Sequence, residues 1–238
     1  MLEVEGLSAG YGLTFHLGGI SFSVEAGSVV GVIGPNGGGK STLLKAVAGV
    51  IPMRGGAIRL GGRPLQRRDG GLAFVPQREE VNWDFPVTAN DVVLMGRYRQ
   101  AGWIRRLDGA DRRRAAEALE RLGLAGTGHR HISQFSGGQQ QRIFLARAIV
   151  QEPRVVLLDE PFTGIDQENR EVLHEVIAGF ARQGVTVLMA THDLDEVAAT
   201  TTHVCCLAGR LVAFGPTASA YNPETLRATF GGQLAVFA

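Results

Sequence analysis

Lysine is nearly absent from this chain of 238 residues: it occurs only at Lys40 and Lys45, and the other 22 of the 24 basic residues are arginines. Cysteine is as scarce, and its two copies, Cys205 and Cys206, are adjacent in an apolar run. That setting is typical of small buried side chains and argues against a metal or redox site. The formal net charge is only +1, so the composition gives no sign of a nucleic-acid surface.

Long apolar runs are missing too. None approaches the eighteen or so residues that a membrane-spanning helix needs, and residues 1–5 lack the character of a signal segment. We therefore expect a cytoplasmic protein without membrane spans of its own. Apolar residues make up 45% of the chain, which suffices for a sizeable core in one large domain or two small ones.

Glycine is abundant, and residues 34–41 read GPNGGGKS between an apolar run, 29–33, and a periodic run, 42–48. Strand, loop and helix in this order form a phosphate cradle, because glycines let successive N–H groups turn inward at the positive end of a helix. Lys40 is expected to reach the β- and γ-phosphates, and Ser41 to ligate Mg²⁺. A flexible turn is the alternative, and the lysine, in a chain that otherwise uses arginine, argues against it. The residues expected to hold a nucleotide here are Gly34, Asn36, Gly37, Gly38, Gly39, Lys40, Ser41 and Thr42.

A second helix start has similar chemistry. Residues 136–142 read SGGQQQR and precede an apolar helical run at 143–150. A hydroxyl and two glycines at a helix start predict another anion-binding terminus, so that one triphosphate can lie between two such ends. The residues expected to bind there are Ser136, Gly137, Gly138 and Gln139.

Acidic and imidazole side chains follow two buried strands. The run 155–158 ends on Asp159 and Glu160, and the run 184–190 ends before His192. Because neighbouring strand residues point differently, Asp159 is predicted to help hold magnesium and Glu160 to orient or deprotonate a water. A histidine just beyond a parallel strand lies at the edge where ligands bind and is predicted to donate to a γ-phosphate, although a structural histidine is the commoner case.

Three further positions leave both a structural and a functional interpretation open. Gln77, at the exit of the strand 72–76, suits a metal or water beside the phosphates, although taken alone a solvated loop glutamine is the default. Tyr11 suits either packing on the sheet or stacking under adenine. Asp166 suits capping of the helix 167–182 at least as well as a functional role.

The remaining pattern divides the chain. Residues 1–33 predict short strands, 55–62 a hairpin strand and 87–151 an inserted helical lobe, with a capping box at 88–91 and an amphipathic helix over 108–122. The lobe is locally basic, which is usually a solvated face and less often a surface for anionic lipid or RNA. Strands at 204–208 and 211–214 and a helix capped at Asn222 follow. The arginines of the lobe are Arg97, Arg99, Arg105, Arg106, Arg112, Arg113 and Arg114.

The motifs in this order resemble the ATPase subunit of ATP-binding-cassette (ABC) transporters over essentially the whole chain. The segment 34–41 is similar to its Walker A motif, Gln77 to the Q-loop, 136–139 to the signature, 155–159 to Walker B with Glu160 behind it, 164–166 to the D-loop and His192 to the H-loop. Two departures keep the residue class: Phe135 replaces a leucine before the signature, and 163–166 reads TGID in place of SALD.

The resemblance implies an α/β fold: a P-loop NTPase core over 1–86 and 152–238, with a mixed sheet flanked by helices and an N-terminal antiparallel β subdomain, plus a helical subdomain over 87–151. It also implies a head-to-tail pair of chains with two ATP molecules at the interface. In each site Ser136, Gly138 and Gln139 come from the partner chain, Tyr11 stacks on adenine, and Asp166 belongs to the D-loop. The implied ligands on the first chain are Lys40, Ser41, Gln77, Asp159, Glu160 and His192, with Mg²⁺ on Ser41, Gln77 and Asp159.

A separate permease is implied because the chain has no membrane span of its own, and it would dock in a groove near the Q-loop. The segments 76–88 and 91–98 are similar to those of the family branch whose members import manganese or zinc with an extracytoplasmic binding protein. The branch for iron chelates and cobalamin is the alternative. ABC proteins that act on DNA or ribosomes usually carry two cassettes or basic arms, and a non-hydrolysing module is disfavoured by Glu160 beside Lys40 and His192.

Overall fold

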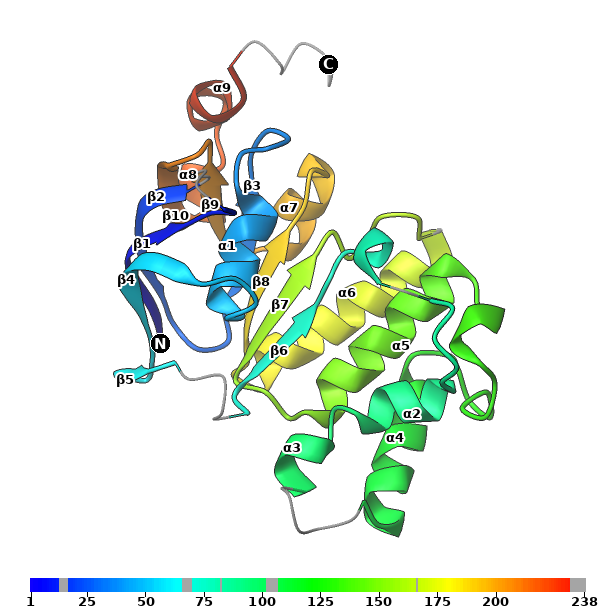
Figure 1. The fold of residues 1–238 in the computed structure, drawn as a ribbon. Coiled ribbons are helices and arrows are strands. Elements are labelled where there is room, and N and C mark those ends of the chain that lie inside the picture. The colour runs from blue at the N-terminus through cyan, green and yellow to red at the C-terminus, as the bar shows by residue number, and fades with distance from the viewer. Residues whose placement is uncertain (13–16, 66–69, 82, 102–106, 166, 232–238) are drawn as a thin grey trace.

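The computed structural model describes residues 1–12, 17–65, 70–81, 83–101, 107–165 and 167–231. Two β-sheets and a set of helices make up a mixed α/β fold (Figure 1). This is the predicted fold class. No helix within the described ranges is long and apolar enough to cross a bilayer.

The smaller sheet is antiparallel and comes from the first quarter of the chain. Leu2 and Val4 are buried while Glu3 and Glu5 are more exposed, which is the alternation of a half-buried strand. A register irregularity after Val4 shifts the pattern by one residue, so that Leu7 is the next buried position. The strands, in the spatial order β2-β1-β4-β5, are β2 (Leu17–Val24), β1 (Leu2–Ala9), β4 (Met53–Leu60) and β5 (Arg63–Pro64).

The larger sheet has six strands and carries the centre of the molecule. Its strands β3, β7 and β8 are five residues each and buried at every position, because helices cover both faces of a parallel sheet. Only β10 runs antiparallel, against β9. In the order β10-β9-β3-β8-β7-β6 they are β10 (Leu211–Pro216), β9 (His203–Leu207), β3 (Val29–Ile33), β8 (Thr186–Ala190), β7 (Val155–Asp159) and β6 (Leu72–Val75).

The register of the larger sheet sets the position of the loops. Asp159, the last residue of β7, lies opposite Ala190, the last of β8, and Val32 of β3 also lies opposite Ala190. The segments that follow β3, β7 and β8 therefore leave the sheet at one edge, where α/β sheets bind their ligands.

Helix α1 contacts strand β1 of the smaller sheet and strands β7 and β8 of the larger one, so it lies between the sheets. Helices α2, α4 and α5 pack against one another, and α5 also contacts β6. The helices are α1 (Lys40–Val47), α2 (Ala89–Leu94), α3 (Tyr98–Ala101), α4 (Gly109–Arg121), α5 (Gly137–Val150), α6 (Gln167–Arg182), α7 (Leu194–Thr200), α8 (Thr217–Ala220) and α9 (Pro223–Phe230), with short 3-10 turns at Arg78–Glu80 and Ile132–Gln134.

The capping signals act where the sequence placed them. Thr88 and Asp91 form the expected capping box of α2, Asp108 caps α4, and Asn222 caps α9. Helix α1 starts two residues before the periodic run that predicted it. The hairpin strand expected at 55–62 is β4 (Met53–Leu60), shifted by two residues because Met53 already pairs with Ala9 of β1, while Gly61 and Gly62 have positive φ and turn the chain.

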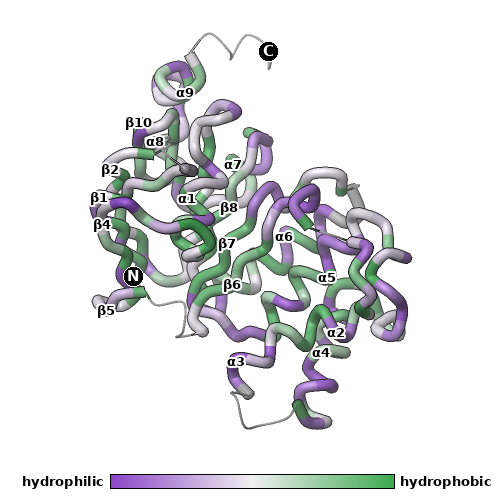
Figure 2. Tube along the Cα trace, in the orientation of Figure 1, coloured by the Kyte–Doolittle hydropathy of each residue, from purple (hydrophilic) through white to green (hydrophobic). Residues whose placement is uncertain are grey.

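Two predictions about side chains have opposite outcomes. Cys205 and Cys206 are buried and form no disulfide within the described part of the chain, as expected. Arg97, expected on a solvated face, is instead buried: its Nε donates to Asp111 Oδ1 at 3.0 Å and its Nη1 to the carbonyl of Val150 at 2.9 Å. This arginine ties α4 to the end of α5. Figure 2 shows the apolar residues gathered along strands such as β6 and β7.

Candidate functional site

The loop between β3 and α1 is fixed by its glycines. A Cβ on Gly34 would lie 1.9 Å from the carbonyl oxygen of Leu207, and one on Gly38 would lie 2.9 Å from that of Pro35. Gly39 occupies the N-cap position with φ 97°, a left-handed conformation that favours glycine. No side chain of the described residues caps α1, so its first N–H groups face the loop.

Lys40 begins α1 and is buried beneath the loop. Its Nζ donates to the carbonyl oxygens of Gly34 at 2.9 Å and Pro35 at 3.3 Å. Burial lowers the pKa of Lys40, and the charges of Glu160 and Asp159 oppose that shift. The ammonium group is therefore held under the loop, where it has lost part of its hydration. An anionic ligand bound there would compensate for that loss and favour the charged form of Lys40.

Ser41 and Asp159 face each other below the same loop. Ser41 Oγ donates to Asp159 Oδ1 at 2.9 Å, and Oδ2 is buried with no hydrogen-bond partner among the described residues. Burial raises the pKa of Asp159 to about 6, more than the hydrogen bond from Ser41 lowers it. A hydroxyl beside a carboxylate with an orphaned oxygen fits Mg²⁺, which prefers oxygen ligands and keeps several waters.

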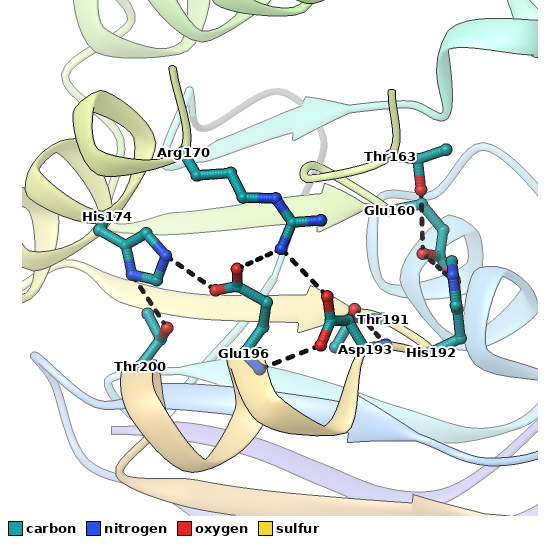
Figure 3. Close-up of polar contacts among 9 residues, drawn as sticks. All are labelled: Glu160, Thr163, Arg170, His174, Thr191, His192, Asp193, Glu196 and Thr200. Carbon is teal, nitrogen blue, oxygen red and sulfur yellow. Dashed lines mark hydrogen bonds and ion pairs between the residues drawn. The ribbon is translucent and has the colours of Figure 1, made fainter. Parts of the chain in front are cut away.

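Glu160 follows β7 and His192 lies just beyond β8, and their side chains meet at the carboxyl edge of the larger sheet. His192 Nδ1 lies 2.7 Å from Glu160 Oε2, and the two side chains lie together at one side of Figure 3. Glu160 has φ 50°, and its N–H donates to the carbonyl of Ala190 at 3.0 Å. A non-glycine residue in this conformation costs free energy, which the hydrogen bond to β8 helps to offset.

One cavity of about 590 Å³ joins these groups. It holds the cradle, Gln77 and the Glu160–His192 pair together, as the motifs predict. It also includes Thr163, whose Oγ1 donates to Glu160 Oε2 at 3.4 Å, and Phe230 of α9. Its lining residues are Gly34, Pro35, Asn36, Gly37, Gly38, Gly39, Lys40, Ser41, Thr42, Gln77, Glu160, Thr163, His192 and Phe230.

The second predicted helix end lies elsewhere. Ser136 caps α5: its Oγ accepts from the Gln139 N–H at 3.4 Å, and its own N–H donates to Gln139 Oε1 at 3.0 Å. Gly137 packs against Arg78, so that a Cβ there would lie 2.8 Å from Arg78 Nε. None of residues 136–139 lines the cavity of the same chain. Within one chain the two helix ends are not brought together.

Tyr11 lies outside the cavity. Its side chain is exposed and hydrogen-bonds to Lys45 of α1, which also forms an ion pair with Glu80 in the turn after Gln77. Asp166 falls outside the described residues. Sequence reasoning missed this Lys45–Glu80 pair and Phe230, for which the local sequence carries no motif. It named Thr163 only as part of the D-loop variant, without a contact to Glu160.

A glycine cradle on an uncapped helix, a Ser–Asp pair beneath it and a Glu–His pair at the edge of a parallel sheet define a P-loop nucleotide hydrolase. The family model described as ABC transporter matches residues 17–163, more than half of the chain. The chain belongs to the ABC transporter family, whose ATP-binding subunits hydrolyse ATP.

Two curated relatives extend the similarity to nearly the whole chain. The zinc transport system ATP-binding protein of Treponema pallidum is 40% identical over 98% of this chain and 88% of its own length. The manganese transport system ATP-binding protein of Bacillus subtilis is also 40% identical, over 98% of this chain and 93% of its own. Among solved structures, a dimeric post-hydrolysis state of an ATP-binding cassette bound to ADP and phosphate has a TM-score of 0.78 and 25% identity, covering 91% of this chain and 98% of that one.

Proposed function

We propose that this chain is the ATP-hydrolysing subunit of an importer for divalent metal ions, manganese or zinc, and that it works at the inner face of the cell membrane. The observation that carries the ATPase part is the cavity lined by Lys40, Ser41 and the Glu160–His192 pair, with Asp159 hydrogen-bonded to Ser41 behind its wall. The metal part is supported by the full-length similarity to zinc and manganese transport subunits. An importer of iron chelates or cobalamin is the second candidate, favoured by similarity to a chelated iron transport protein of Yersinia pestis.

We assign the phosphates of ATP to the cradle, with Lys40 at the β- and γ-phosphates. Ser41, Asp159 and Gln77 would hold Mg²⁺, which supplies charge neutralisation to the phosphate oxygens when bound. Glu160 accepts a proton from the attacking water. The water oxygen bonds to the γ-phosphorus as the bond from that phosphorus to the β–γ bridging oxygen breaks, which gives ADP and phosphate. His192 donates a hydrogen bond to the γ-phosphate, and its Nδ1 lies 2.7 Å from Glu160 Oε2.

We propose that Ser136, Gly137, Gly138 and Gln139 complete the site of a second copy of the chain, in a head-to-tail pair. Their absence from the lining of their own chain's cavity supports this, as does the dimeric state of a related cassette. In that arrangement Tyr11 leaves Lys45 to stack on adenine, and Asp166 belongs to the D-loop. ATP then stabilises the pair until its hydrolysis.

A second cavity, of about 600 Å³, is proposed as the permease site. It lies at the far end of α1, where Ala46 and Val47 line it together with residues of β6, α3 and α5. Val50, Met53, Met95 and Tyr98 line the same cavity and are each at least 40% exposed. Exposed apolar residues that surround a hollow are typical of a docking surface. We expect a permease segment there, and through the permease an indirect link to an extracytoplasmic metal-binding protein.

Co-purification tests the transport assignment. The chain is expressed with its native neighbouring genes, membranes are solubilised in mild detergent, and proteins recovered with it are identified by mass spectrometry. We expect a stoichiometric protein with several membrane spans, and manganese or zinc in any associated binding protein. Met95→Asp should abolish recovery of that protein, whereas Ala199→Asp, an exposed change on α7, should not.

Recovery of ribosomes or DNA, or of no membrane protein, would overturn the transport assignment and leave the ATPase assignment standing. Iron or cobalamin in the associated binding protein would favour the second candidate.

A further inference from the structure

A partly buried set of polar contacts lies beside the Glu160–His192 pair (Figure 3). Arg170, in the first turn of α6, donates through Nη1 to Asp193 Oδ2 at 3.1 Å and to Glu196 Oε1 at 2.6 Å. Glu196 lies in α7 with its carboxylate nearly buried, and its Oε2 lies 2.8 Å from His174 Nε2. One guanidinium nitrogen thus links α6 to two carboxylates at the start of α7.

Arg170 also reaches the turn that carries Glu160. Its guanidinium carbon lies 5.9 Å from the centre of the Phe162 ring, and Phe162 is buried two residues after Glu160. Asp193, on the other side, directly follows His192. A small cavity of about 170 Å³ is lined by Arg170, Glu160 and His192 together. The same side chain therefore touches both turns that hold the pair.

Besides the bond from Thr163 Oγ1 to Glu160 Oε2, the pair needs support from the turns that carry it. The His192 side chain is 59% exposed, and the backbone of Glu160 is in the left-handed region. Asp193 is the N-cap of α7 and its N–H donates to Thr191 Oγ1 at 3.0 Å, so its position decides where His192 points. Burial acts to raise the pKa of Asp193, but the hydrogen bond from Arg170 and its other partners more than offset burial, and the lowered pKa keeps the carboxylate charged.

We propose that Arg170 is a positioning residue for ATP hydrolysis: by bridging the turn of His192 and the turn of Glu160, it holds the two side chains in register. Arg170 lines no part of the large nucleotide cavity, so it acts through the pair and not on the nucleotide. The inference rests on the proposed roles of Glu160 and His192. It assigns to α6 the task of aligning the segments that follow β7 and β8.

The test compares variants of the purified full-length chain at concentrations that saturate pairing. Turnover, the dissociation constant for ATP measured in EDTA, and the unfolding temperature are recorded for each. Arg170→Met should lower kcat by about 10-fold to 100-fold, the range expected for misplaced catalytic groups, with ATP affinity within about twofold of the parent. Arg170→Lys, which keeps the charge, should recover part of the loss.

Two further variants separate positioning from folding. Asp193→Asn removes the charge that Arg170 binds, yet asparagine caps a helix as well as aspartate does, so α7 should stay folded while kcat falls. Arg182→Met removes an exposed ion pair with Glu175 on α6, the helix that carries Arg170, and should change neither kcat nor the unfolding temperature.

Wild-type turnover in Arg170→Met would overturn the inference. So would a fall in ATP affinity and unfolding temperature that accounts for all of the lost activity. Glu160→Gln separates the two levels of assignment. If Glu160→Gln keeps wild-type turnover, the proposed site itself fails; if Glu160→Gln is inactive and Arg170→Met is not, only the positioning role fails.

Discussion

Helices α1 and α5 both begin in glycine-rich segments, but their N-termini are capped differently. At α1 the N-cap is Gly39 in a left-handed conformation, with no cap from any described side chain, whereas at α5 Ser136 and Gln139 satisfy each other in a complete capping box. The first end keeps its N–H groups for a ligand, and the second bonds its own. The difference shows that the same composition yields either a preformed anion site or a closed one, depending on whether a side chain occupies the N-cap.

The side-chain cap at the start of α5 is nevertheless weak. The bond from the Gln139 N–H to Ser136 Oγ is 3.4 Å long, at the upper limit for a hydrogen bond. Exchanging it for a charged phosphate oxygen is favourable, because charge-assisted bonds are stronger. We therefore interpret α1 as the end that binds ATP first, and α5 as the end that joins when a second chain arrives.

Glu160→Gln tests both ends at once and should have the largest effect. Removing the base lowers turnover by about 1,000-fold, within the range for a lost general base, while both helix ends still hold ATP. The pair should then persist, seen as a doubled mass by light scattering in ATP and Mg²⁺. A variant that stays single under these conditions would contradict the role of the α5 end.

Lys40→Ala tests the α1 end alone. Loss of a buried cation that binds phosphates should weaken ATP binding by about 100-fold. Titration calorimetry measures the change, and Arg182→Ala, which removes an equal charge from an exposed site, is the control. Near-normal affinity would mean that the loop backbone alone holds the phosphates.

Ser136→Ala tests the α5 end. Loss of the cap should lower the free energy of unfolding by about 1 kcal/mol. It should leave ATP affinity of the single chain unchanged and reduce ATP-dependent pairing. Thr88→Ala breaks the same kind of box on α2, away from the cavity, and should cost similar stability without affecting pairing. Equal loss of pairing in both would reduce the α5 effect to stability.

The smallest expected effect concerns the strand beneath the α1 end, where Cys206 lies opposite Ile33. Burial raises the pKa of both Cys205 and Cys206. Since only the thiolate reacts, neither cysteine should be alkylated by iodoacetamide at pH 8 while the chain is folded. Mass spectrometry counts the labels, with denatured protein as the positive control. Rapid labelling would show that this support opens readily.

Local patterns allowed much of this to be predicted. The fold class was confirmed, and the helix over 167–182, the caps at Thr88 and Asn222 and the strand ending at Asp159 lie where the sequence placed them. Each is encoded by neighbouring residues. The roles assigned to the site residues stay predictions, although the structure gathers the cradle, Gln77, Glu160 and His192 in one cavity.

What failed depended on contacts between distant residues. Arg97 looked like a surface arginine because its own segment is basic, and its burial follows from Asp111 and Val150 on other helices. Arg170 and Asp193 are 23 positions apart and meet only because α6 and α7 pack beside each other. The adenine role of Tyr11 stays a prediction, and its contact with Lys45 is a further one between distant residues.

Helix α1 touches both cavities, with Lys40, Ser41 and Thr42 in one and Ala46 and Val47 in the other. At 1.5 Å per residue, a helix of this size is about 12 Å long. The helix is a stiff element whose first residues line the phosphate cavity and whose last residues line the second cavity. We infer that a displacement of its phosphate end would carry through the helix to the proposed docking cavity.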